Sequence, residues 1–402
     1  MTKLIVYILS LFLSGVFFFY IAILWYKIKK RYYDKKVLKL KPKIEEIVKR
    51  YMNCSQSIYD GGNCIRNSIE LETRCIEQRN IALKNLKLLT KKDVERNIVE
   101  SVIFNYGKTK NKVSAEIFAT LAEELGLVKY YTKMLSDKDH HKVAEAAEKL
   151  GQFRSKRPIT QLLNVLKSGN TYESYNSLLA LAKIGDEEAF IEGFKHSESI
   201  EYLTHRSLID IIDSFEGDIL KLYSKMVKSN NSYIASLFIK SASNSITYDK
   251  SLLNNENMKN IEETLVSYLK SDNTELRISS IKFLGAMKES KYINQIAHCL
   301  KDESWEVRAI AAKTLGNFNE DTGSYLIKAL TDKVWTVRYN AAYSLINSKE
   351  YEKYISMILN DEDRFAKDII IAVLDNTKKT REIKDKNILN KIKNHTNVIK
   401  EA

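Results

Sequence analysis

Residues 300–318, LKDESWEVRAIAAKTLGNF, decide the fold, because related segments flank them on both sides. One copy begins 31 residues earlier at Leu269, the next begins 30 residues later at Leu330, and a weaker one begins 29 residues further on at Leu359. A unit of about 30 residues holds two short helices and cannot bury its own apolar face. The period therefore predicts an all-α solenoid in which neighbouring helix pairs stack.

The copies share residue types at matching offsets. An aspartate is followed five or six positions later by a basic residue, and small or apolar residues then fall at +3, +4 and +7 from it. This spacing places them on one face of a helix. The aspartate stands where an N-cap would accept the free N–H groups of that helix, and a glycine stands where the helix should end. The shared positions are Asp272, Asp302, Asp332 and Asp361; Arg277, Arg308, Arg338 and Lys367; and Gly285 and Gly316.

Eroded copies of the repeat lie further towards the N-terminus. Residues 135–153 keep Asp137, Ala146 and Gly151 but carry Val143 at the arginine position. A fainter copy begins at residue 166, and the register is difficult to follow between residues 190 and 258. The spacing as a whole predicts about seven or eight repeats.

The pattern D-x-x-x-x-V-R-x-x-A-A-x-x-L-G, clearest in residues 302–316, resembles the short HEAT repeats of the phycobilisome-lyase-like kind. Residues 115–151 are similar to the start of the repeat domain in bacterial membrane-anchored HEAT-repeat proteins. The resemblance covers residues 89–375 and implies a solenoid that acts as a scaffold, in some such proteins serving envelope or exopolysaccharide machinery. In this repeat type the aspartates and arginines resemble a structural ladder, in which each aspartate accepts from an arginine of an adjacent repeat.

Residues 4–26, LIVYILSLFLSGVFFFYIAILWY, contain no charged residue. As a helix they reach about 34 Å, enough to cross a hydrocarbon core of about 30 Å. A cleaved signal peptide is the rival interpretation, but it favours a shorter apolar core and a small-x-small cleavage site, whereas this segment ends in Trp25 and Tyr26. Positive charge crowds the C-terminal flank, which predicts a single-pass inner-membrane protein with its bulk in the cytosol. The residues expected against anionic lipid headgroups are Lys27, Lys29, Lys30 and Arg31.

The net charge of +13 is concentrated beside this apolar segment. Residues 27–50 hold eleven basic and three acidic residues, which leaves a net charge of only +4 over residues 51–402. A nucleic-acid-binding solenoid would carry its positive charge on the repeats themselves. The distribution therefore favours a protein partner over nucleic acid.

Two tryptophans are the strongest candidates for contact with that partner. Trp305 and Trp335 stand three residues after the aspartate and three before the arginine, and His140 holds this place in the early repeat. Aromatic side chains beside arginines such as Arg308 and Arg338 have the composition of a binding hot spot. The alternative is that each tryptophan packs against the neighbouring repeat.

The sequence carries no motif for catalysis, for a cofactor or for a metal. It lacks GxGxxG, Walker A, GxSxG and HExxH motifs, its cysteines form no CxxC pair, and the His-Glu pairs of HEAT-type di-iron hydroxylases are missing. We therefore expect a binding protein, with an enzyme or enzyme subunit resembling the HEAT-like bilin lyases as the alternative. The cluster of Cys54, Cys64 and Cys75 is open to a disulfide or to ordinary half-buried thiols.

These observations predict five segments along the chain. The expected organisation is an anchor over residues 1–26, a basic juxtamembrane segment over 27–51, a helical linker or N-terminal cap over 52–106, a solenoid over 107–375 and a C-terminal cap or tail over 376–402. The function that fits them best is a membrane-tethered cytosolic scaffold.

Overall fold

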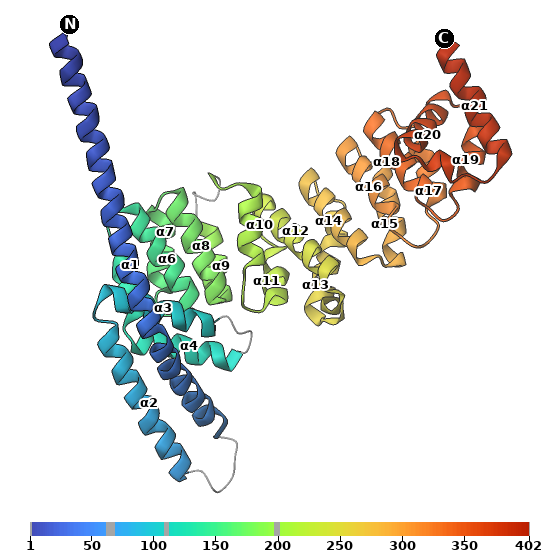
Figure 1. Cartoon of the computed structure of the whole chain (residues 1–402). Helices are drawn as coiled ribbons and strands as arrows, with labels where there is room; N and C mark the ends of the chain where they lie inside the picture. The colour runs from blue at the N-terminus through green and yellow to red at the C-terminus, as the bar shows by residue number, and fades with distance from the viewer. Residues whose placement is uncertain (1, 62–68, 108–111, 197–201, 402) are drawn as a thin grey trace. The chain divides into compact units, whose positions relative to one another are not determined.

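The computed structural model is built from helices joined by turns, and its described residues contain no β-strand (Figure 1). This confirms the predicted all-α fold. The chain divides into two compact units, Met1–Ser199 and Ile200–Ala402, each of which is described by itself. The structure describes residues 2–61, 69–107, 112–196 and 202–401.

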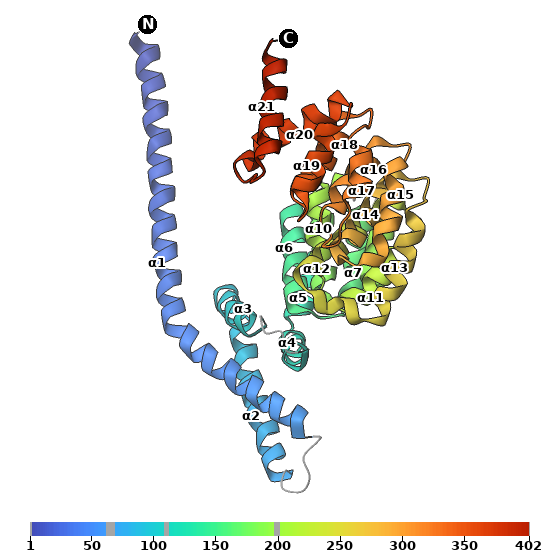
Figure 2. The same ribbon diagram turned by 90° about the vertical axis from the view of Figure 1, so that its right-hand side faces the viewer.

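The first unit opens with a single helix of 60 residues, α1 (Thr2–Gly61). Among the described residues α1 is the one helix long and apolar enough to cross a membrane, and the apolar window that qualifies it has a mean hydropathy of 1.4 with no part of it buried. A signal sequence near an N-terminus meets the same test of length and composition. Pro42 lies inside α1, where it removes a helical hydrogen bond, and Figure 2 shows that the helix bends along its course.

The C-terminal half of α1 packs against α2 (Ile69–Leu89), α3 (Asp93–Gly107) and α4 (Lys112–Glu124). The Tyr51 hydroxyl on α1 donates to Glu124 on α4 at 2.6 Å, and Arg79 on α2 donates to Glu124 at 2.7 Å and to the Tyr51 oxygen at 3.2 Å. Burial and the adjacent carboxylate raise the pKa of Tyr51 to about 12. This polar cluster therefore joins α1 to two other helices.

Five further helices complete the described part of the first unit. They pack as neighbouring layers, with α6 against α8 and α7 against both α8 and α9. The helices are α5 (Leu127–Met134), α6 (His140–Phe153), α7 (Ile159–Ser168), α8 (Thr171–Ile184) and α9 (Glu187–His196).

The second unit consists of two rows of helices. We call α10, α12, α14, α16, α18 and α20 the inner row, because Figure 1 shows them along the inside of the curve of this unit, and each packs on the next. The remaining α-helices form the outer row. The bounds are α10 (His205–Asp213), α11 (Ile219–Met226), α12 (Ser232–Tyr248), α13 (Glu256–Tyr268), α14 (Thr274–Met287), α15 (Ile293–His298), α16 (Trp305–Leu315), α17 (Gly323–Ala329), α18 (Trp335–Ile346), α19 (Tyr351–Asn360), α20 (Arg364–Thr377) and α21 (Lys386–Glu401), with short 3₁₀ turns at Lys250–Asn254, Ser290–Tyr292, Cys299–Lys301 and Lys379–Arg381.

Small residues let the inner helices approach one another closely. A Cβ atom added at Gly316 of α16 would lie 2.5 Å from the Ser344 hydroxyl of α18, and the same hydroxyl donates to the Ala312 carbonyl at 2.9 Å. Gly285 of α14 meets Thr314 of α16 in the same way. Successive inner helices pack more closely than successive outer helices, and this difference curves the stack towards the inner row.

The predicted role of the glycines is right at one position and wrong at the other. Gly316 is the C-cap of α16, as expected, whereas α14 continues past Gly285 to Met287 and ends at Lys288, which has a φ of 58°. Gly285 is therefore a place of close helix contact and does not terminate its helix.

We expect Gly151→Ala in α6 to destabilise the protein by about 1–3 kcal/mol, because the added Cβ would lie 2.6 Å from the backbone Cα of Ala180. Gly193→Ala in α9 is the matched control, since its Cβ meets only leucine methyl groups at 3.1 to 3.2 Å and the helix gains propensity. Urea denaturation followed by circular dichroism tests this order. Equal midpoints for both variants would contradict the close-contact account.

Candidate functional site on the inner row

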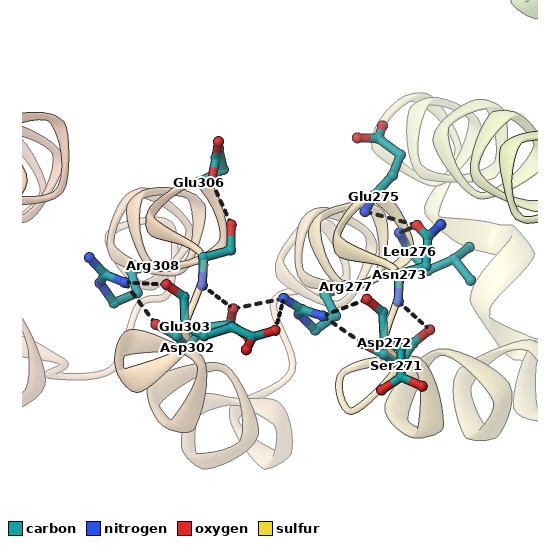
Figure 3. Close-up of polar contacts among 11 residues, drawn as sticks. Ser271, Asp272, Asn273, Glu275, Leu276, Arg277, Asp302, Glu303, Glu306 and Arg308 are labelled. Carbon is teal, nitrogen blue, oxygen red and sulfur yellow. Dashed lines mark hydrogen bonds and ion pairs between the residues drawn. The ribbon is translucent and has the colours of Figure 1, made fainter.

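The ladder of arginines and aspartates joins three successive repeats, and Figure 3 shows its first link, from Arg277 to Asp302. Arg277 on α14 donates to Asp302 at 2.9 Å, and Arg308 on α16 donates to the two carboxylate oxygens of Asp332 at 2.6 and 3.1 Å. Each guanidinium also donates to backbone carbonyls of the loop before its own helix, at 2.7 to 3.2 Å. Both arginines are buried, so their donors serve the contact between repeats.

The predicted N-cap role of the aspartates is wrong. Asp302 accepts from the backbone N–H of Ser304 at 2.9 Å, and Asp332 accepts from that of Val334 at 2.8 Å, so each carboxylate holds the cap residue two positions later. Because the aspartate lies two residues before the cap, its carboxylate can also accept hydrogen bonds from the arginine of the preceding repeat. At the other two places the residues that cap the helices are Asn273, next to Asp272, and Asp363, two residues after Asp361.

The ladder changes at its C-terminal end. Arg338 on α18 donates to the Asp332 carbonyl at 2.7 Å, and its guanidinium lies 5.6 Å from the centre of the Phe365 ring. Asp361 accepts from the backbone N–H of Asp363 at 3.1 Å. Within the described ranges the cross-repeat ladder therefore comprises the Arg277 and Arg308 pairs, and the arginine of α18 faces an aromatic ring instead.

Electrostatics favours the ionised form of Asp332. Burial is the largest single influence and opposes ionisation, but the hydrogen bonds from Arg308 and from the Val334 N–H, together with the charge of Arg308, outweigh it and hold the pKa of this carboxyl below its ordinary value. A folded-state pKa below the unfolded value contributes stability above about pH 4, and that stability is lost as the pH falls through the folded-state pKa.

The candidate partner residues fall into different surroundings. Trp305 and Trp335 are the first residues of α16 and α18, and 42% and 57% of their surfaces are exposed, so neither is enclosed by a neighbouring repeat. Arg308 is held inside the ladder. His140 belongs to the first unit, where its Nδ1 lies 2.7 Å from Glu173 of α8.

Two tyrosines continue from Trp335 along α18, of which Tyr343 is exposed and Tyr339 is half-buried. The rings of Trp335 and Tyr339 stack with centres 5.0 Å apart, and those of Tyr339 and Tyr343 stack at 6.5 Å. We call Trp335, Tyr339 and Tyr343 the aromatic column. Their spacing of four residues puts them on one helix face, a signal that the sequence contained and that the repeat alignment did not use. Phe365 on α20 is also exposed.

A second group missed from the sequence lies on the same row. Lys240, Lys282 and Lys313 are the ninth residues of α12, α14 and α16, and we call them the lysine row. The Lys282 side chain is exposed, but part of it is buried by the surrounding protein. This partial burial and the charge of Lys240 lower the pKa of Lys282, and the charge of Lys313 lowers it further. Lys240 pairs with Glu275 and lies 3.3 Å from the His205 ring.

The basic residues after the apolar segment lie on α1. Lys27, Lys29, Lys30 and Arg31 are exposed, and Lys29 approaches the Trp25 ring centre to 4.9 Å. Lys36, further along, pairs with Glu95 of α3 at 3.0 Å. Part of the positive flank therefore holds α1 to the folded unit.

The three described cysteines are free thiols, and burial together with the neighbouring Cys75 raises the pKa of Cys54. Cys54 and Cys75 are free and half-buried, and burial raises the pKa of Cys299 to about 11. Cys64 lies outside the described residues. In the part of the chain that the structure describes, no group of three or more His, Cys, Asp or Glu side chains is arranged to hold a metal ion.

The comparison with known families supports the repeat assignment. The family described as HEAT repeats matches residues 261–346 and 293–375. No curated protein matches the chain. The chain is thus an all-helical solenoid with HEAT repeats in its second unit.

Solved structures with similar helical repeats include an engineered protein, with 17% identity, a TM-score of 0.34, and coverage of 83% of this chain and 98% of that one. The complex of CpcE and CpcF of phycocyanin lyase from Nostoc sp. PCC7120 has 15% identity, a TM-score of 0.27, and coverage of 67% and 94%. Kap95p in its complex with RanGDP has 13% identity, a TM-score of 0.32, and coverage of 90% and 64%.

We expect Asp332→Asn to destabilise the protein by about 3 kcal/mol, because it leaves the buried Arg308 guanidinium without its carboxylate. Glu303→Gln is the control: this carboxylate lies 3.6 Å from Arg277 but is 87% exposed, and its loss should cost less than about 1 kcal/mol. Urea denaturation at pH 7 and pH 3 provides the measurement. The difference in free energy of unfolding between the two variants should be smaller at pH 3 than at pH 7. A difference that does not change with pH would argue against the ion pair.

Proposed function

We propose that the chain is a membrane-tethered scaffold whose inner row binds a segment of a protein partner. The observation that carries the proposal is the exposed aromatic surface on successive inner helices. Trp305, Trp335, Tyr343 and Phe365 present large rings to solvent on a row whose other apolar side chains are mainly buried, and the half-buried Tyr339 stacks between two of them. On this proposal the chain catalyses no reaction itself.

Exposed aromatic rings suit a binding role because they bury a large apolar area with little loss of conformational freedom. The ladder fixes the register between the helices that carry them, so the rings are held in place before a partner arrives. Such pre-organisation reduces the entropic cost of association. Arg338, which faces Phe365 outside the ladder, supplies a positive charge beside the rings.

The tether is α1, with its apolar segment in the bilayer and its basic flank at the cytosolic surface. The positive-inside rule supports this orientation, and each basic side chain near anionic lipid contributes about 1 kcal/mol. Because α1 continues as a helix into the Tyr51 cluster, the anchor is joined directly to the first unit. Confinement to the membrane raises the effective concentration of a partner in the same membrane.

The scaffold role predicts that full-length protein extracted in mild detergent at low salt retains a stoichiometric protein partner. The double variant Trp335→Ala/Tyr339→Ala should weaken this complex by at least about tenfold, since aromatic hot spots contribute about 2 kcal/mol or more. Tyr248→Ala is the control, because this tyrosine is 91% exposed at the end of α12. Recovery of the bare protein, or equal retention by all variants, would count against the role.

The proposed topology makes a separate prediction. The protein should resist extraction by alkaline carbonate, and deletion of residues 2–26 should release it into the soluble fraction. A C-terminal green fluorescent protein fusion should fluoresce, whereas a C-terminal alkaline phosphatase fusion should be inactive, because phosphatase requires export. An active phosphatase fusion would reverse the orientation, and a soluble full-length protein would refute the anchor.

A further inference from the structure

Tyr343, the last residue of the aromatic column, holds on α18 the place that the lysines hold on the preceding inner helices. Gly285, the twelfth residue of α14, meets Thr314, the tenth residue of α16. Gly316, the C-cap of α16, meets Ser344, the tenth residue of α18, so α14, α16 and α18 pack in the same register. The ninth residues therefore follow one another along the row. In order they are Lys240, Lys282, Lys313 and, on α18, Tyr343.

Positive charge on this row is only partly compensated within the chain. Lys240 is paired with Glu275, but Lys282 and Lys313 form no ion pair among the described residues. Lys282 is exposed on the helix between those that carry Lys240 and Lys313, and the charges of both act on it. An anionic group placed against Lys282 and Lys313 would replace like-charge repulsion with attraction.

We propose that the inner row binds an extended acidic segment of a partner protein, with carboxylates on the lysine row and an apolar side chain on the aromatic column. This inference rests on the proposed scaffold function and specifies the chemistry of the partner. Charge complementarity selects the acidic residues. The stacked rings of Trp335, Tyr339 and Tyr343 select the apolar one.

The spacing of the helices restricts the sequence of the ligand. Packed helices lie about 8–10 Å apart, so successive lysines recur at about that interval. A polyproline II segment rises about 3.1 Å per residue with three residues per turn, and it presents the same face about every 9 Å. A carboxylate at every third position therefore matches the lysine row, and an apolar residue three positions beyond the last carboxylate reaches the aromatic column.

The same surface is poorly suited to a nucleic acid. Residues 200–402 contain 30 lysines and arginines against 28 aspartates and glutamates, and Glu275 and Glu306 lie in the first turns of the helices that carry Lys282 and Lys313. A continuous phosphate backbone would meet these carboxylates as well as the lysines. A peptide with spaced acidic residues avoids that repulsion.

The test titrates fluorescein-labelled peptides into detergent-solubilised full-length protein and follows fluorescence anisotropy. The first peptide carries glutamate at three positions spaced by three, then leucine three positions later, with proline and alanine between them. Two further peptides replace glutamate by glutamine or space the glutamates by two. We expect the first peptide to bind about tenfold more tightly than either of the others, with affinity that falls as salt rises.

The protein variants assign the site. The double variant Lys282→Gln/Lys313→Gln should lower the affinity for the first peptide at least about tenfold. The control variant Lys301→Gln/Lys328→Gln removes the same charge from exposed positions outside the row, and it should change the affinity less than about twofold. Equal binding by the two double variants would overturn the proposal. It would also fail if a single-stranded oligonucleotide of equal charge bound more tightly than the peptide and depended on the same lysines.

The outcome is separable from that of the scaffold function. If partner capture depends on Trp335 and Tyr339 while no acidic peptide binds, the acidic-segment inference is wrong and the scaffold function stands. If the peptide binds through Lys282 and Lys313, the inference holds even when no partner survives extraction.

Discussion

The close approach of the inner helices is the constraint on which the second unit depends. Side chains at the contact positions must be small, as Gly316 and Ser344 are, because a larger atom would separate helices that also share the Arg308–Asp332 pair. Packing and electrostatics thereby select the same register. Once that register is fixed, the face of an inner helix that contacts neither its neighbours in the row nor the outer row is free to vary, and the exposed lysines and aromatic rings occupy that face.

Periodicity made the fold predictable from the sequence. The alanines, the leucine and the basic residue recur at fixed offsets because each repeat packs against its neighbours in the same way. Residues 300–318 carry the full set of these residues. The roles of Asp302 and Gly285 were harder to assign. An aspartate just before a helix is normally interpreted as its N-cap. The Asp302 carboxylate instead accepts from the N–H of the cap residue and from the arginine of the preceding repeat, and this arrangement depends on where the neighbouring repeat lies.

The candidate site was only partly visible in the sequence. Trp305 and Trp335 stood out because they share an offset, but their exposure depended on whether the next repeat covered them. Tyr339, Tyr343 and the lysine row escaped notice because surface positions do not repeat in kind: lysine on three helices gives way to tyrosine on the fourth. Residues that bind a ligand differ from repeat to repeat, whereas residues that hold the stack do not.

The helical continuity of α1 gives the tether a length as well as an attachment. From Tyr26, at the end of the apolar segment, the helix rises about 15 Å to Lys36, which pairs with Glu95 of α3. It continues along the folded unit to Tyr51, in the cluster with Arg79 and Glu124. A flexible linker would let the first unit explore a hemisphere above the bilayer. A helical strut instead holds it at a set height, so in the proposed topology only partner segments extending a comparable distance from the membrane come within its reach.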